Sequence, residues 1–236
     1  MQRILITGAN RGIGLELARQ YLDQNDTQVF ATCRDPESAD ELGLLVSAHV
    51  ERAHVIQLDV VDQTSIAASV EEVSKHTGGL DVLINNAGIN PATEREQTFG
   101  RLDADAMLHV LHINSVAPVM VAQAYAGLLR AGDNAKLVNV SSGAGSIARQ
   151  NSGCGYTYNA SKSALNMFTR CLAGTFRGDN IVVITLNPGW VKTDMGGPNA
   201  SLEPERSISG ILKLVEGLSM SDSGEFFNWD GTSLPW

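Results

Sequence analysis

The stretch RILITGANRGIG (Arg3–Gly14) decides the fold class of this 236-residue chain. Arg3–Thr7 is an apolar, β-branched run that predicts a buried strand. The turn TGANRGIG (Thr7–Gly14) follows directly, with Gly-x-x-x-Gly-x-Gly spacing, and opens a helical pattern. Glycines let backbone approach a phosphate closely, and a helix N-terminus favours an anion. An ordinary glycine-rich turn is the alternative, but the position after an N-terminal strand favours a dinucleotide pyrophosphate site.

The alternation of apolar runs with helical patterns continues along the whole chain. Strands are predicted at Arg3–Thr7, Gln28–Cys33, His54–Val60, Leu80–Gly88, Lys136–Ser142, Asn180–Gly189 and Glu225–Trp229. Helices are predicted at Leu15–Leu22, Ser38–His49, Thr64–His76, Asp103–Leu129, Tyr158–Phe176 and Pro204–Leu218. Strands that are apolar throughout belong to a parallel sheet covered on both faces. The pattern predicts an α/β, Rossmann-type doubly wound parallel seven-stranded sheet, in a single domain over residues 1–236.

The charge balance excludes some partners. The chain has 17 lysines and arginines against 26 aspartates and glutamates, a formal net charge of −9. Nucleic acid and anionic membranes both require a basic surface, so we expect neither. The hydrophobic share of 43% is typical of a globular protein with a buried core.

The cysteines and the N-terminus bear on the compartment. Cys33, Cys154 and Cys171 form no CxxC pair and no metal-site spacing, so we predict a reduced cytoplasmic protein without a metal. The N-terminal run shows no signal-peptide pattern. Ala106–Leu129 has no charged residue and is long enough to cross a bilayer. Its histidines, asparagine, serine, proline and glutamine favour a helix buried inside the protein instead.

Three stretches with little helical pattern each follow the carboxyl end of a predicted strand. They are Asn90–Gly100, Gly143–Gly155 and Trp190–Leu202, the last extending to about residue 203. Ligands of open α/β sheets bind at this edge, so we expect the three loops to wall a substrate cleft. Apolar residues on these loops favour an apolar carbonyl compound as substrate: Ile89, Pro91, Ala144, Ile147, Trp190, Met195 and Leu202.

The end of the second strand bears on the choice of cofactor. An acidic residue there would accept hydrogen bonds from a ribose 2′-hydroxyl. Instead the strand ends at Cys33 and is followed by Arg34, and Arg11 in the glycine turn is able to reach the same volume. Two guanidinium groups suit a 2′-phosphate, which favours NADP(H). Asp35 keeps NAD(H) open, because a shift of one residue would make it the ribose ligand.

Tyr158 and Lys162, in YNASK, are four residues apart at the start of a predicted helix and therefore share one face. An ammonium group near a phenol lowers the pKa of the phenol, which favours proton exchange with an alcohol or carbonyl oxygen. The spacing occurs on many surface helices, so it needs the surrounding motifs to carry this interpretation.

Those motifs together resemble the short-chain dehydrogenase/reductase family over essentially the whole chain. They are TGANRGIG, LDV at Leu58–Val60, NNAG at Asn85–Gly88, HINSVAP at His112–Pro118, VNVSS at Val138–Ser142, YNASK, and NPGWVKTD at Asn187–Asp194. The turn GAGSIARQNSGCGYT and the ending FFNWDGTSLPW look similar to C-factor and sniffer-like carbonyl reductases within this family.

The resemblance implies four catalytic residues. Tyr158 would be the general acid in reduction and the base in oxidation, and Lys162 would lower its pKa and hold the nicotinamide ribose. Ser142 would polarise the substrate carbonyl, with Ser141 as the alternative serine. Asn114 would hold a water that links Lys162 to solvent.

The residues expected to contact the cofactor lie in five of the seven motifs and at Arg34. They are Gly8, Asn10, Arg11, Gly12, Ile13, Gly14, Arg34, Asp59, Val60, Asn86, Ala87, Gly88, Tyr158, Lys162, Pro188, Gly189, Val191 and Thr193.

One departure concerns the segment between Ser142 and Tyr158, which is a few residues longer than in many family members. It carries Arg149, Gln150 and Cys154 toward the expected cleft, so a relative's substrate does not transfer to this chain. No histidine or aspartate is placed by sequence to activate Cys154, which is interpreted as a loop thiol.

The leading hypothesis is an NADPH-dependent oxidoreductase that reduces a small or apolar aldehyde or ketone. The alternative is a dinucleotide-binding regulatory or signalling protein of C-factor type, which would have no chemical need for Ser142, Tyr158 and Lys162 together. A nucleotide-sugar epimerase ranks last, because too little chain follows Gly189 to build its substrate domain. Helices that are apolar on more than one face favour a homodimer or homotetramer over a monomer.

Overall fold

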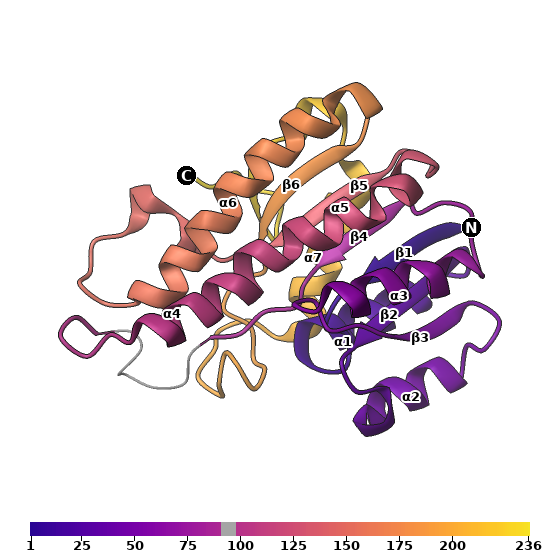
Figure 1. The fold of residues 1–236 in the computed structure, drawn as a ribbon, viewed down its shortest axis with the longest axis horizontal. Coiled ribbons are helices and arrows are strands. Elements are labelled where there is room, and N and C mark those ends of the chain that lie inside the picture. The colour runs from indigo at the N-terminus through magenta and orange to yellow at the C-terminus, as the bar shows by residue number, and fades with distance from the viewer. Residues whose placement is uncertain (91–97) are drawn as a thin grey trace.

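The computed structural model describes residues 1–90 and 98–236, and these build one sheet of seven parallel strands (Figure 1). The strands are β1 (Gln2–Ile6), β2 (Thr27–Cys33), β3 (Ala53–Gln57), β4 (Val82–Asn85), β5 (Lys136–Val140), β6 (Val182–Asn187) and β7 (Phe226–Asn228). Their order in the sheet is β3-β2-β1-β4-β5-β6-β7. The chain runs outward from β1 in one direction and from β4 in the other, which is the doubly wound topology. The predicted fold class is confirmed.

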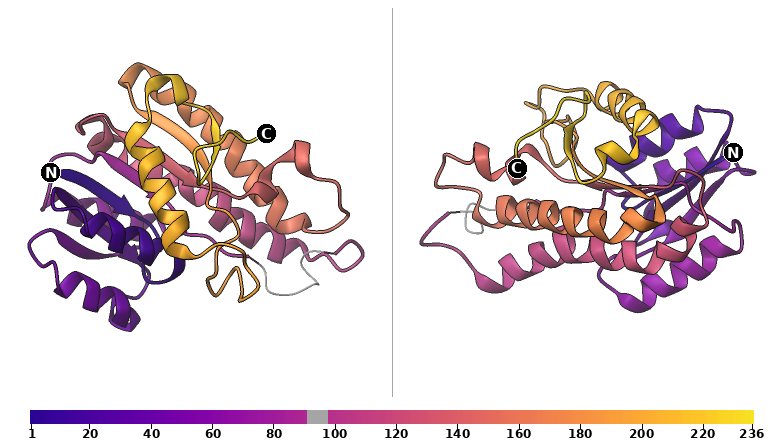
Figure 2. Two further views of the ribbon diagram at one scale, coloured as in Figure 1. Left: turned by 180° about the vertical axis from the view of Figure 1, so that it is seen from behind. Right: turned by 90° about the horizontal axis from the view of Figure 1, so that it is seen from above.

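Helices cover both faces of the sheet (Figure 2). They are α1 (Gly12–Leu22), α2 (Asp40–Ser47), α3 (Gln63–Ser74), α4 (Ala104–Leu111), α5 (Ala117–Arg130), α6 (Tyr156–Phe176) and α7 (Pro204–Gly217). One apolar cluster joins the sheet to α1, α2 and α7, and a second joins its other face to α3, α5 and α6.

The strands are buried on both faces, as their continuous apolar sequences predict. In β1, Ile4 and Ile6 belong to one cluster while Leu5, between them, belongs to the other, because side chains alternate along a strand. All three side chains are fully buried. Burial of each stabilises the fold by roughly 1.5–3 kcal/mol. The same alternation in the neighbouring strands fixes the register, with Ile4 opposite both Val29 and Val82.

The helix predicted as one piece over Asp103–Leu129 is interrupted. A π-helical segment, His112–Val116, separates α4 from α5. Pro118 has no N–H and cannot donate the α-helical hydrogen bond to the Asn114 carbonyl, which disfavours a regular helix at this point. The run Ala104–Arg130 is long and apolar enough to cross a membrane by length and composition. Its α5 part buries Val121 and Tyr125 against the sheet, as a core helix does.

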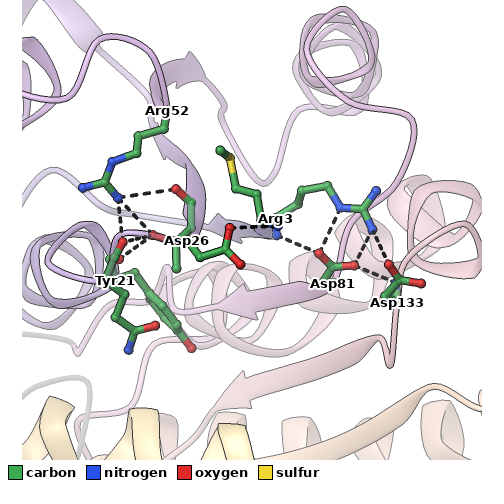
Figure 3. Close-up of polar contacts among 9 residues, drawn as sticks. Arg3, Tyr21, Asp26, Arg52, Asp81 and Asp133 are labelled. Atoms are coloured by element: carbon green, nitrogen blue, oxygen red, sulfur yellow. Dashed lines mark hydrogen bonds and ion pairs between the residues drawn. The ribbon is translucent and has the colours of Figure 1, made fainter.

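Charged side chains tie the amino ends of the strands together (Figure 3). Asp81, just before β4, accepts hydrogen bonds from the Arg3 backbone N–H at 2.7 Å and from its guanidinium at 2.9 and 2.5 Å. Burial works to raise the pKa of Asp81, but the hydrogen bonds from Arg3 outweigh it and leave that pKa below its ordinary value. Arg52, before β3, donates to the carbonyls of Leu22 and Gln24 at the end of α1.

Candidate active site

The glycine turn lies at the carboxyl end of β1 and leads into α1, as predicted. Gly14 packs against the turn so closely that a Cβ there would lie 2.1 Å from the Gly8 carbonyl oxygen. The side chain of Asn86 donates to the carbonyls of Thr7 and Gly8 at 2.9 and 3.0 Å, which fixes the turn against the end of β4. No side chain caps α1 in the part of the chain that the structure describes. Its first N–H groups are therefore left without a side-chain acceptor at the place where the pyrophosphate is expected.

Ser142 and Tyr158 meet at the same edge of the sheet. The side chains of Ser142 and Tyr158 interact with each other, and Ser142 Oγ accepts from the Ala144 N–H at 3.1 Å. Ser141 faces the other way: it is 3% exposed and donates to Asn166 Oδ1 at 2.6 Å. Of the two serines, the structure therefore brings Ser142 and not Ser141 to the tyrosine.

Lys162 lies one helical turn below Tyr158 and is buried. Its Nζ is 5.8 Å from the centroid of the Tyr158 ring and donates to the Val140 carbonyl at 2.9 Å. Burial lowers the pKa of Lys162 to about 8. A Cβ on Gly88 would lie 3.6 Å from this Nζ, so the end of β4 passes directly beside the ammonium group.

The expected low pKa of Tyr158 is not found. Burial raises the pKa of Tyr158, and the hydrogen bond with Ser142 opposes this only in part. The cause is burial of the phenol, and the Lys162 ammonium, which is 5.8 Å from the ring centroid, gives its hydrogen bond to the Val140 carbonyl. Tyr158 is therefore a protonated group at neutral pH, which suits a proton donor.

Asn114 lies in the π-helical segment with a fully buried side chain. Its Oδ1 accepts from the Ile89 N–H at 2.9 Å, and its Nδ2 donates to the Ile89 carbonyl and to Ser161 Oγ at 2.8 and 3.0 Å. The sequence did not indicate these partners. They use the amide to join the loop after β4 to α6, so protein groups are the partners of both the oxygen and the nitrogen of this side chain.

An open concavity of about 640 Å³ lies between β3 and α3, beside two of the residues expected at the adenosine end of the cofactor. Arg34 and Asp59 both line it. Within the described residues the Arg34 guanidinium forms no ion pair, whereas its carbonyl accepts from Gln57 at 3.1 Å. Arg11 lies elsewhere: it pairs with Asp194 at 3.1 Å instead of pointing into this concavity, because that carboxylate lies nearer the glycine turn.

The loop after β6 returns to the glycine turn. A Cβ on Gly12 would lie 3.4 Å from Thr193 Cγ2, which places the expected nicotinamide seat beside α1. Gly189 has φ +84°, and a Cβ there would lie 2.9 Å from Leu202 and 3.0 Å from Trp229. Val191 is buried and pairs with Leu202 across this loop. The loop after β6 is thus packed against the glycine turn at Thr193 and against Leu202 and Trp229 at Gly189.

The loops expected to wall the cleft lie at this edge, although residues 91–97, including Pro91, fall outside the described residues. A bridge between Thr98 and Cys154 joins the first loop to the second. The Cys154 thiol is exposed and lies 3.2 Å from Ser152 Oγ. Ile147, Trp190 and Met195 are 74%, 57% and 51% exposed, respectively, so the rim carries apolar surface.

The residues that the structure describes include no group of three or more histidines, cysteines, aspartates or glutamates placed to hold a metal ion. The arrangement at the carboxyl edge instead offers helix N–H groups, two hydroxyls and a buried ammonium.

Comparisons with known proteins agree with this arrangement. The family model described as short chain dehydrogenase matches residues 2–203. The C-signal of Myxococcus xanthus is 40% identical over 160 residues, covering 68% of this chain and 95% of that protein. Two solved structures cover all of this chain. NADPH-bound carbonyl reductase from chicken fatty liver has 38% identity, a TM-score of 0.93 and 99% coverage of its own chain. Carbonyl reductase Sniffer of D. melanogaster has 36% identity, a TM-score of 0.94 and full coverage.

The chain belongs to the short-chain dehydrogenase family. The prediction of an NAD(P)-dependent oxidoreductase of single-domain type is thereby confirmed, and so is the likeness to C-factor and sniffer-like proteins.

Proposed function

We propose that this protein is an NADPH-dependent carbonyl reductase that converts a small or apolar aldehyde or ketone into an alcohol. The observation that carries the proposal is the meeting of the Ser142 and Tyr158 side chains, beside the buried ammonium of Lys162. Two hydroxyl donors at one point are suited to a carbonyl oxygen that gains negative charge during reduction.

The residues divide the work as follows. Ser142 donates a hydrogen bond to the substrate carbonyl oxygen and polarises it. Bound NADPH would supply the hydride that the carbonyl carbon accepts. Tyr158 donates its proton to the oxygen, and its raised pKa keeps that proton in place until the oxygen becomes basic. Lys162 stabilises the phenolate that remains and holds the nicotinamide ribose. The Asn114 carbonyl holds the water through which Lys162 exchanges protons with solvent.

NADP(H) is the cofactor that the site favours. Arg34 lines the concavity at the adenosine end with its guanidinium free of ion pairs among the described residues, as recognition of a 2′-phosphate requires. Asp35, the residue that would favour NAD(H), precedes a short 3₁₀ turn, Pro36–Ser38, and does not line the concavity. The similarity to a carbonyl reductase with NADPH bound supports the same choice.

The experiment is a turnover assay with NADPH and NADH over a panel of aromatic aldehydes, quinones and ketones. We expect NADPH to be oxidised and Tyr158→Phe to abolish this while leaving NADPH binding nearly unchanged. Tyr156→Phe is the matched control, because Tyr156 begins the same helix and is 40% exposed. Turnover retained in Tyr158→Phe, or turnover of charged sugars or acyl-carrier thioesters alone, would contradict the proposal.

A second candidate is a dinucleotide-binding regulatory protein with little turnover. The observation that favours it is the 40% identity to the C-signal of Myxococcus xanthus. The same assay separates the two: a regulator would bind NADPH without oxidising it against any member of the panel.

We further propose that the protein works in the cytoplasm as a homodimer or homotetramer. Large apolar side chains are exposed on α4, on the π-helical segment and on α6, namely Leu108, Val116, Met167 and Phe168. A second copy would cover them. Sedimentation equilibrium of the wild type, compared with a Met167→Glu variant, tests this assembly.

A further inference from the structure

One amide oxygen joins two of the loops at the active site. Asn187 is the last residue of β6, and its Oδ1 accepts from the Gly143 N–H at 2.9 Å and from the Gly189 N–H at 3.2 Å. Gly143 follows Ser142 directly, and Gly189 belongs to the expected nicotinamide seat. The same oxygen therefore holds the backbone next to the polarising serine and the backbone of the expected nicotinamide seat.

The orientation of this amide is set from the adjacent strand. Asn187 Nδ2 donates to Asn228 Oδ1 at 2.7 Å, and Asn228 Nδ2 donates to Asp230 Oδ1 at 3.0 Å. Hydrogen bonds from Thr232 hold the pKa of Asp230 below its ordinary value, so Asp230 is a carboxylate that only accepts. We call Asp230, Asn228 and Asn187 the amide relay.

Both ends of the amide relay demand the same orientation. The carboxylate at one end requires the Asn228 NH₂ group to face it, which turns the Asn228 oxygen toward Asn187. The two backbone N–H groups at the other end require the Asn187 oxygen to face them. If either amide were reversed, donors would meet donors or acceptors would meet acceptors.

The C-terminal segment that carries Asn228 and Asp230 also holds the loop between Ser142 and Tyr158. The carbonyl of Pro235 accepts from Ser146 Oγ at 2.6 Å, and the carbonyl of Trp236 accepts from the Ala148 N–H at 2.8 Å. The Trp236 ring stacks on Phe226 in β7, with ring centroids 5.4 Å apart. The ending FFNWDGTSLPW thus contacts the loop after β5 at Ser146 and Ala148, and its Trp229 lies against Gly189 in the loop after β6.

We propose that Asn187 is a positioning residue for carbonyl reduction, which fixes Gly143 beside Ser142 and Gly189 in one geometry, and that Asn228 and Asp230 set its orientation. The inference rests on the reduction proposed above at Ser142 and Tyr158. Misplacement of a polarising group by about 1 Å is able to cost on the order of 100-fold in rate, so a small rotation of this amide has a large effect.

The test compares two variants of the full chain with the wild type. Asn228→Leu removes the acceptor for Asn187 and frees its amide to rotate. Thr232→Val is the control, because it removes a hydrogen bond to Asp230 at 2.6 Å in the same turn without touching the bond between Asn228 and Asn187.

We expect Asn228→Leu to lower kcat about 10- to 100-fold, with the dissociation constant of NADPH within about threefold of the wild type. Thr232→Val should keep kcat within about threefold. Hydrogen–deuterium exchange at the Gly143 and Gly189 amides should be faster in Asn228→Leu alone. A lower melting temperature in Asn228→Leu with normal kcat and normal exchange would overturn the inference, as would a loss of kcat in Thr232→Val as large as that in Asn228→Leu.

The exchange measurement separates this inference from the proposed function. If the wild type reduces no carbonyl compound, the proposed function fails. The protection of the Gly143 and Gly189 amides and its loss in Asn228→Leu still decide whether the amide relay fixes both loops.

Discussion

The ammonium nitrogen of Lys162 lies over the face of the Tyr158 ring, 5.8 Å from its centroid, and donates its hydrogen bond to the Val140 carbonyl rather than to the phenol. The pKa values of the two groups are shifted in opposite directions. Burial raises the pKa of Tyr158 and lowers that of Lys162 to about 8.

The first prediction concerns the pH dependence of cofactor binding. Because the pKa of Lys162 is about 8, its cationic fraction falls as the pH rises through that value, well below the ordinary range for lysine. The affinity for the anionic NADPH should fall about 3- to 10-fold between pH 7 and pH 9. Fluorescence titration of NADPH at each pH measures this. Lys162→Met should show a flat profile, and a slope equal to that of the wild type would refute the assignment.

The second prediction separates the two neighbouring serines. Ser142→Ala should lower kcat by about 100- to 1000-fold, because it removes a donor to the developing oxyanion. Ser141→Ala should keep turnover but lower the free energy of unfolding by about 1–2 kcal/mol, because it leaves a buried hydrogen-bond partner on Asn166 unsatisfied. Steady-state rates and urea unfolding of both variants test this, and equal losses of turnover would contradict it.

The third prediction concerns two glycines in helices. Gly14→Ala should abolish NADPH binding, because a Cβ would lie 2.1 Å from the Gly8 carbonyl oxygen and would open the turn. Gly43→Ala, in α2, meets no atom within 4 Å and should stabilise the fold by roughly 0.5–1 kcal/mol through helix propensity. Thermal unfolding and NADPH titration distinguish the two. NADPH binding by Gly14→Ala at wild-type affinity would show that the turn does not hold the pyrophosphate.

The fourth prediction addresses cofactor choice. Arg34→Ala should lower the ratio of NADPH to NADH affinity about 10- to 100-fold, since a charge-assisted hydrogen bond to the 2′-phosphate is lost. The affinity for NADH should stay near the wild-type value. Arg19→Ala is the control, because Arg19 pairs with Glu16 in α1. If Arg34→Ala weakened both cofactors equally, the 2′-phosphate assignment would fail.

The fifth prediction concerns stability in acid. The folded pKa of Asp81 lies below its unfolded value, so the ionised carboxylate stabilises the fold above about pH 4, and this contribution is lost as the pH falls through the folded pKa. Asp81→Asn should lower the free energy of unfolding by roughly 3 kcal/mol at pH 7. The difference from the wild type should shrink below pH 4. A constant difference in urea unfolding from pH 7 to pH 3 would exclude this account.

Sequence patterns predicted the order of the strands and helices well, because the apolar runs and the glycine turn are local signals. The predicted element boundaries were wrong where a side chain takes the hydrogen bond of a backbone N–H group that would otherwise join the sheet or helix. The strand predicted over His54–Val60 ends at Gln57, since the Asp59 N–H donates to Ser65 Oγ and the Val61 N–H donates to the Asp59 carboxylate. The interruption at His112–Val116 has no signal in a 3.6-residue period, although Pro118 marks the place.

For the candidate site, too, some features were predicted from the sequence and others were not. Family motifs predicted that Ser142, Tyr158 and Lys162 would gather, and the structure brings them together. The direction of the Tyr158 pKa was predicted wrongly, because spacing along a helix does not say which neighbour takes the lysine's hydrogen bond. The partnership of Asn187 with Asn228 joins residues on two strands, and neither the motifs nor the periodicity indicate that these amides face each other.

The contacts of Arg3 and Arg52 in Figure 3 lie on the opposite rim of the sheet from Ser142 and Tyr158. The ion pairs at the amino edge therefore stabilise the fold without contacting the groups at the carboxyl edge. Substitutions that strengthen the amino edge should raise the melting temperature and leave the contacts of Ser142 and Tyr158 in place. The chain can also be tethered to a support near Met1 and Asp26 while the reactive rim stays open.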